Sequence, residues 1–113
     1  MPTRYLFGSV RVNEKEKEYL TKKVSKCRKL LSNYSDEELS LEVEVGQDKK
    51  GFWRIEVMIR TPHELFRVSK QDSDLFRAVD KLKDVLMEQI RRSREKIRDR
   101  QRRKKAGKSE SVA

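Results

Sequence analysis

The most regular pattern of apolar positions in the chain lies between residues 72 and 97. Apolar side chains recur there three or four residues apart, which places them on one face of an α-helix. These side chains are Leu75, Val79, Leu82, Leu86, Ile90 and Ile97. Asp72 can cap the start of this helix, and Asp74 falls in its first turn, where a carboxylate suits the helix dipole. The pattern predicts a long helix whose first half packs on a core.

The same stretch changes character after Ile90. Between residues 91 and 105 basic side chains greatly outnumber the two acids, Glu95 and Asp99. A helix that only packs on a core has no use for such an extension, whereas a polyanionic ligand would explain it. The alternative is a solvated, partly frayed tail, because blocks of like charge repel each other. We expect residues 1–98 to form the folded domain and residues 99–113 a basic, disordered tail.

The first third of the chain predicts a strand followed by a helix. Residues 5–12 are rich in β-branched and aromatic side chains, with Gly8 at a bulge or bend. Asn13 and Glu16 have the spacing of a capping box at a helix start. The helix that follows carries one apolar stripe, formed by Leu20, Val24, Cys27, Leu31 and Tyr34. The opposite face is basic and consists of Lys15, Lys22, Lys26 and Lys29.

The middle of the chain has the period of two that is typical of half-buried strands. Apolar and polar residues alternate over residues 39–45 and again over residues 53–60, and residues 46–51 form the hairpin loop between them. A short fourth strand is predicted at residues 64–69. The order is therefore β-α-β-β-β-α, an α+β fold. One apolar stripe per helix and one apolar face per strand predict a two-layer sandwich, with a four-stranded sheet and two helices on one face.

The charge of the chain favours a nucleic-acid partner. Its 113 residues include 29 basic and 19 acidic side chains, giving a net charge of +10. An anionic membrane is a weaker candidate, because neither helix has aromatic residues facing a purely basic side. The single Cys27 excludes an intrachain disulfide, and its place in the apolar stripe predicts a buried thiol. No signal peptide or membrane-length apolar run is seen, so the cytoplasm is the expected location.

The sequence offers little for catalysis. It contains no glycine-rich phosphate loop, and no cluster of His, Cys or carboxylates has metal-ligand spacing. His63, the only histidine, lies in a turn beside Pro62 and has no candidate partner for nucleophilic chemistry. Trp53 is in phase with the apolar face of its strand, whereas Phe52 is out of phase and better placed to be exposed. We expect no enzymatic activity, no cofactor, no metal and no small-molecule substrate.

The remaining candidate site is basic. Lys22, Lys26 and Lys29 project in line along the first helix, and Lys81, Arg92, Lys96 and Arg103 project in line along the second. If the two helices lie side by side, the two lines could frame a positively charged groove. Such a groove binds phosphates by Coulomb attraction and counterion release, with little sequence readout. The pattern indicates a polyanion, and RNA only by inference.

Residues 5–97 resemble the ribosome hibernation promoting factor family, also called ribosome-associated inhibitors or sigma-factor modulation proteins. The family motif D-[ML]-[YF]-x-A-[IV]-[DN] is matched by Asp74, Leu75, Phe76, Ala78, Val79 and Asp80, with Gln89 further along. The opening V-R-V-N before a lysine-rich helix also matches. The resemblance implies a β-α-β-β-β-α fold that is similar to a double-stranded RNA-binding domain with an added strand. It also implies binding to the small ribosomal subunit between head and body, in the mRNA and tRNA path, and silencing of translation in resting or stressed cells.

The resemblance also carries over individual positions. Lys23, Lys26 and Lys29 match basic family positions on the first helix, and Gln89, Arg92 and Lys96 match positions on the second. Val85 and Glu88 stand where the family usually has basic residues, and Lys83 and Arg91 are candidates to compensate. The predicted rRNA-binding set is Lys22, Lys23, Lys26, Lys29, Lys81, Lys83, Gln89, Arg91, Arg92 and Lys96.

Several functions compete at this stage. The first is a non-enzymatic translation inhibitor that docks in the decoding region of the small subunit. The second is a general structured-RNA binder or ribosome assembly factor, because a fold alone does not determine function. A ribosome-acting hydrolase would need a Gly-Gly-Gln loop, which the chain lacks. A protein-only regulator would need an exposed apolar patch, and the stripes predict none.

Overall fold

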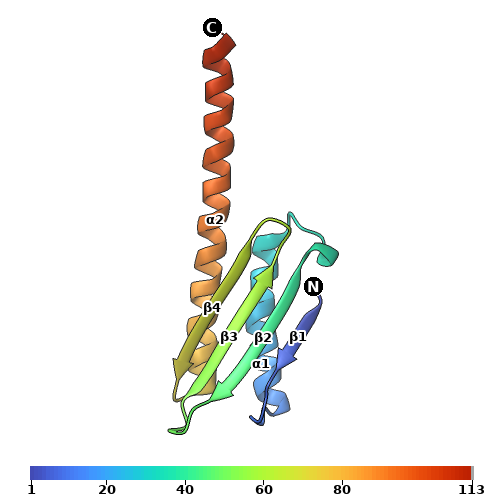
Figure 1. Cartoon of the computed structure of the whole chain (residues 1–113), viewed down its shortest axis with the longest axis vertical. Coiled ribbons are helices and arrows are strands. Elements are labelled where there is room, and N and C mark those ends of the chain that lie inside the picture. Colours follow the sequence, from blue (N-terminus) through green and yellow to red (C-terminus); the bar gives the residue numbers. More distant parts are fainter. Residues whose placement is uncertain (113) are drawn as a thin grey trace.

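The computed structural model consists of one sheet with two helices packed on the same face (Figure 1). It describes residues 1–112, and the side chains of residues 1–102. The elements in order are β1 (Thr3–Leu6), α1 (Glu14–Ser25), two 3-10 segments η1 (Lys26–Leu31) and η2 (Asp36–Glu38), β2 (Ser40–Gln47), β3 (Trp53–Arg60), β4 (Leu65–Asp72) and α2 (Leu75–Val112). The predicted α+β class and the β-α-β-β-β-α order are confirmed. Within the described residues, no helix is long and apolar enough to cross a membrane.

The four strands lie in their sequence order, β1-β2-β3-β4. Strands β2, β3 and β4 form an antiparallel meander, and β1 pairs in parallel with β2. The register aligns the apolar positions across the meander, with Val43 opposite Val57 and Val57 opposite Val68. Because side chains alternate along a strand, this register puts one apolar face toward the helices and leaves a polar face outside.

The first strand differs from the prediction. It spans Thr3–Leu6 and does not extend through residues 5–12. The cause is Gly8, whose φ of +57° places it in the left-handed region that glycine adopts without strain. The chain turns there, and the backbone N–H of Val10 donates to the carbonyl of Phe7 at 3.0 Å. The capping box that follows is confirmed, since the Asn13 side chain accepts from the backbone of Glu16 at 2.8 Å and the Glu16 carboxylate accepts from Asn13 at 3.1 Å.

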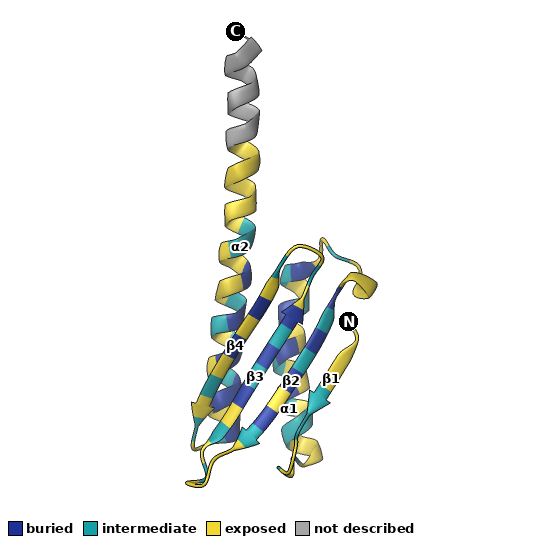
Figure 2. Cartoon of the chain, in the orientation of Figure 1, coloured by how far each residue is buried: buried dark blue, intermediate teal, exposed yellow. Residues whose placement is uncertain are grey.

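The core lies between the sheet and the helices and contains both predicted stripes except for their last members, Tyr34, which is half-buried, and Ile97, which is exposed. Figure 2 shows how buried positions alternate with intermediate or exposed ones along β2 and β3. The α2 stripe is buried from Leu75 to Ile90, and Leu82 at its centre has no exposed surface. Cys27 is also fully buried, and burial raises the pKa of its thiol to about 11. The thiol is therefore protonated at neutral pH and packs as a small apolar group.

Two predicted boundaries at the junction between β4 and α2 are corrected, the end of the strand and the start of the helix. Strand β4 runs three residues further than predicted, to Asp72, which pairs with Trp53 of β3. Asp72 therefore ends a strand and does not cap the helix. The cap is Asp74, whose carboxylate accepts from the backbone of Phe76 at 2.9 Å and whose carbonyl accepts from Ala78 at 3.0 Å. The Asp72 carboxylate instead accepts hydrogen bonds from the backbone of Asp74 and from the ammonium of Lys81, at 3.0 and 2.6 Å.

Acid is expected to remove a stabilising contribution of Asp72. Hydrogen bonds from Lys81 and from the Asp74 backbone lower the pKa of Asp72 to about 2. A folded-state pKa below the unfolded value means that the contribution is fully present above about pH 4 and is lost as the pH falls through about 2. Urea unfolding should therefore show a larger loss of stability between about pH 5 and pH 2 for the wild type than for Asp72→Asn. Equal losses would contradict this role.

Residues beyond about 98 are expected to exchange their amide protons quickly in the free protein. Helix α2 extends to Val112, but the apolar stripe ends at Ile97, and the predicted tail, residues 99–113, lies mostly outside the side chains that the structure describes. Like charges without apolar contacts make a helix end marginal. The division into domain and tail stays a prediction, which hydrogen exchange on the monomer tests. Strong protection in this segment would contradict it.

Candidate nucleic-acid interface

The two helices meet along a seam that opens on the side away from the sheet. Tyr19 of α1 donates its hydroxyl to Asp80 of α2 at 2.6 Å. The same aromatic ring meets the ring of Phe76 edge to face, with centroids 4.9 Å apart and planes at 80°. The hydrogen bond to Asp80 raises the pKa of Tyr19, which keeps the phenol protonated as a donor. These contacts set the side of α2 that faces α1.

Four lysines gather along this seam, and we refer to them as the lysine cluster. They are Lys22 and Lys23 of α1, Lys26 of η1 and Lys83 of α2. Repulsion from Lys23 is the main cause that lowers the pKa of Lys26, followed by partial desolvation and by repulsion from Lys83 and Lys22. The cluster is therefore a concentration of positive charge that a bound anion would relieve.

Two acids contact the cluster, and the first of them, Asp80, is already engaged; the second, Asp84, lies 3.2 Å from the ammonium of Lys83. Asp80 accepts the Tyr19 hydroxyl and lies 3.6 Å from the ammonium of Lys23. That ammonium also lies 5.2 Å from the centre of the Tyr19 ring, a cation–π contact. Lys23 is thus held in place by two partners, whereas Lys22 and Lys26 are exposed and have no ion-pair partner among the described residues. The cluster presents both fixed and free ammonium groups to solvent.

The predicted line along α2 does not face the cluster. Lys81 lies two residues before Lys83, a rotation of about 200° around the helix axis. It therefore points to the opposite flank of α2, where it pairs with Asp72 at the end of β4. Arg92 shares that flank and pairs with Glu88 at 3.1 Å. The helices do lie side by side, but the expectation that both basic lines frame one groove does not match this geometry.

The other predicted residues are spread over the surface. Lys29 is exposed on η1, while Gln89, Arg91 and Lys96 are exposed on α2. Gln89 and Arg92 border a shallow depression together with the acids Asp84 and Glu88, which reduce the positive charge of that flank. The structure thus brings together Lys22, Lys23, Lys26 and Lys83 out of the predicted set, and an RNA-binding role for each of the ten residues stays a prediction.

Two arginines that the sequence did not single out hold the upper end of the seam. Arg94 of α2 donates to the carbonyl of Leu30 and to Oδ1 of Asn33, and so ties α2 to the end of η1. Arg28 donates to three acceptors, the carbonyls of Leu31 and Tyr34 and the carboxylate of Asp36. Both contacts join segments that are distant or irregular in sequence, so no periodic pattern could have revealed them.

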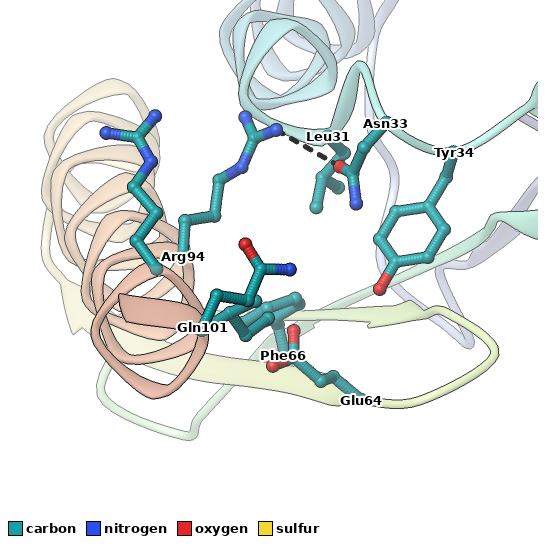
Figure 3. A pocket seen from close by; sticks show the side chains of 9 residues that line it. Leu31, Asn33, Tyr34, Glu64, Phe66, Arg94 and Gln101 are labelled. Carbon is teal, nitrogen blue, oxygen red and sulfur yellow. Dashed lines mark hydrogen bonds between the residues drawn. The ribbon is translucent and has the colours of Figure 1, made fainter. Parts of the chain in front are cut away.

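Beneath Arg94 lies an open pocket of about 240 Å³. Figure 3 shows Arg94 reaching Asn33 across its rim, with Phe66 and Glu64 below and Tyr34 opposite. Glu64 is engaged, because its carboxylate accepts from the hydroxyl of Ser93. His63 is exposed in the neighbouring turn between β3 and β4. Within the described part of the chain, no three His, Cys, Asp or Glu side chains are grouped to hold a metal ion.

The fold and the charge together define a small basic α+β domain with a four-stranded sheet. The model of the family described as Sigma 54 modulation protein / S30EA ribosomal protein matches residues 7–98. The chain belongs to this family, and the resemblance seen in the sequence is confirmed.

Individual relatives agree with this assignment. The chain is 29% identical over 84 residues to the ribosome hibernation promotion factor of Deinococcus radiodurans, a match that covers 74% of this chain and 44% of the relative. This chain thus spans about half the length of the curated relative it matches. The crystal structure of the N-terminal domain of Thermus thermophilus Protein Y is 27% identical, with a TM-score of 0.66, and the match covers 81% of this chain and 98% of that one. A ribosomal subunit interface protein from Coxiella burnetii, 16% identical with a TM-score of 0.68 over 83% and 98% of the two chains, shares the fold.

Proposed function

We propose that this protein is a ribosome hibernation factor that acts in the cytoplasm. It binds the rRNA of the small ribosomal subunit in the decoding region, occupies the path of mRNA and tRNA, and so inhibits translation in resting or stressed cells. Membership of the family and the name of the Deinococcus relative support ribosome hibernation. The observation that carries RNA binding is the lysine cluster, which joins charge from both helices at one seam.

The distribution of charge supports the helical side as the RNA-binding face. On the outer face of the sheet, Glu56 pairs with Arg54 at 3.4 Å and with Arg67 at 2.9 Å, so the charges there offset one another. That face also has no set of stacked aromatic residues of the kind that sheet-type RNA readers use. Phosphate contacts made by lysine position a protein on RNA but read little sequence. Recognition would then depend on the shape of the folded rRNA.

The mode of inhibition follows from occupancy. A protein that blocks the mRNA and tRNA path acts as one copy per ribosome and is not a catalyst. In a purified translation system, inhibition is therefore expected to rise in proportion to the added protein and to be complete near one copy per ribosome. Ribosomes that already hold mRNA and initiator tRNA should resist inhibition. Full inhibition at far below one copy per ribosome would point to an enzyme and reject this function.

Sedimentation with purified subunits tests the partner. The protein should pellet with the small subunit and not with the large one. Binding should weaken steeply as salt is raised, because it releases counterions from the phosphates and this release is less favourable at high salt. A duplex RNA of unrelated sequence, added in excess, is the control. If the duplex competes the protein off the pelleted small subunits as effectively as an equal amount of added small subunits does, the chain is a general structured-RNA binder. The proposed partner would then be wrong.

A further inference from the structure

An exposed aromatic ring lies beside the lysine cluster. Phe76 retains 41% of its surface exposed, although it sits in the first turn of α2, where the helix is otherwise well packed. The other large exposed apolar residues of the described chain are distant from it: Phe52 lies in the β2–β3 loop, Leu65 at the start of β4, and Ile97 about 30 Å further along α2. Phe76 is therefore not part of a broad apolar patch of the kind that binds another protein. What sets Phe76 apart is its place beside the lysine cluster, through its contact with Tyr19.

The ring of Phe76 is held in a fixed position. The backbone of Phe76 donates to the Asp74 carboxylate, which caps the helix. Tyr19 supports the ring from one side, and Tyr19 is itself fixed by Asp80 and by the ammonium of Lys23. Two of these neighbours, Asp74 and Asp80, are acids, and each lies 3.6 Å from a cation, Arg77 and Lys23 respectively, which offsets its charge. A ring whose position is already restricted loses little entropy when a second ring stacks on it.

The distance between the ring and the cluster suits one stretch of RNA backbone. Lys83 follows Phe76 by seven residues, two turns of helix, which is a rise of about 10 Å. Lys23 reaches the same region, because its ammonium lies 5.2 Å from the centre of the Tyr19 ring, which contacts the Phe76 ring. A nucleotide whose base lies at Phe76 would thus have its own and the next phosphates along the lysine cluster.

We propose that Phe76 is a stacking site for an unpaired RNA base, and that Tyr19 supports it from behind while the lysine cluster binds the adjacent phosphates. The inference rests on the proposed function and deepens it, because it identifies single-stranded nucleotides as part of the target. Aromatic side chains bind unpaired bases of any sequence by stacking, since every base has a π-face. Duplex RNA, whose bases are already stacked, could use only the lysines.

Phe76→Leu tests this inference, with Phe52→Leu as its matched control. Phe52 has nearly the same exposure, 42%, but lies in the hairpin loop between β2 and β3. Binding is measured for the full chain with a single-stranded oligouridine and with purified small subunits, over a series of salt concentrations. Phe76→Leu should weaken binding to both by about ten-fold or more, the effect of losing one stacked base. The salt dependence should keep its slope, because no phosphate contact is removed.

Further variants and the second binding partner show whether a loss of binding comes from stacking, from misfolding or from a wrong proposed function. Phe76→Trp, which keeps a stacking ring, should bind at least as well as the wild type, and thermal unfolding should show that both variants fold. Wild-type affinity in Phe76→Leu, or a loss confined to Phe52→Leu, would overturn the inference. If the wild type binds oligouridine but not small subunits, the proposed function is wrong. The effect of Phe76→Leu on oligouridine binding then still tests whether Phe76 stacks on bases. Binding of neither RNA would reject both.

Discussion

Replacing Lys22, Lys26 and Lys83 together by glutamine is expected to lower affinity for the small ribosomal subunit by at least about a hundred-fold at 0.1 M salt. Each phosphate neutralised contributes roughly 0.7–0.9 to the slope of log affinity against log salt, which amounts to about five- to eight-fold between 1 M and 0.1 M salt. The losses of affinity from three such contacts multiply, which gives more than about a hundred-fold in total. All three side chains belong to the lysine cluster and none is part of the core. Sedimentation at several salt concentrations measures both the affinity and a slope reduced by about two to three, and translation inhibition should be lost in parallel.

A variant with the same change of net charge serves as the control. It replaces three exposed basic residues that lie away from the helices. Two are in the β2–β3 hairpin loop, Lys49 and Lys50, and the third, Arg60, is on the outer face of the sheet. Their replacement by glutamine should weaken binding much less. Equal losses in the two triple variants would mean that only net charge matters. A larger loss from Arg92→Gln combined with Lys96→Gln would move the RNA-binding face to the opposite flank of α2 and contradict the cluster.

Leu82→Ala is expected to reduce the free energy of unfolding by about 2–5 kcal/mol, the usual cost of removing a fully buried leucine side chain. Leu82 has no exposed surface and lies at the centre of the α2 stripe, where the helix packs on β3 and β4. A loss of this size is a large part of the stability of a domain of about 100 residues. Urea unfolding followed by circular dichroism measures it. Leu82→Met, which nearly conserves volume, should cost less than about 1.5 kcal/mol.

Ile97→Ala is the comparison for Leu82→Ala. Ile97 belongs to the same stripe by spacing but is 39% exposed, since it lies where α2 leaves the sheet. Its truncation should change stability by well under half of the loss seen for Leu82→Ala. If Leu82→Ala itself cost well under 1 kcal/mol, the stripe would not be the core that holds α2 on the sheet.

Periodicity predicted the parts of this fold that depend on burial alone. The stripe of α2 and the alternation in β2 and β3 required only that apolar side chains share one face, and these faces are buried up to Ile90 of α2, with Ile97 exposed. The capping box of α1 was also predictable, because Asn13 and Glu16 interact within one turn. Such local rules do not depend on how distant elements are arranged.

The errors arose where a local signal had two outcomes. Asp72 and Asp74 are both good capping residues, and the choice between them depends on how far β4 pairs with β3. The stripe of α2 identifies the side that faces the sheet, but it does not tell which of the two flanks faces α1. That flank is set by Tyr19, Phe76 and Asp80, contacts between distant segments. For this reason the sequence placed Lys81 and Lys83 in one site, and the structure separates them.

Because β1 pairs in parallel with β2, the order of folding is expected to differ from the order of synthesis. Thr3 pairs with Leu41, far along the chain, whereas Gln47 pairs with Trp53 across one short loop. Closing the longer loop costs more entropy, so the meander is expected to form first and β1 to dock afterwards. Until it docks, the edge of β2 is open to any strand of suitable sequence. The first strand of a second copy fits that edge equally well, so exchange of N-terminal strands between partly folded chains is the mis-assembly that this topology favours.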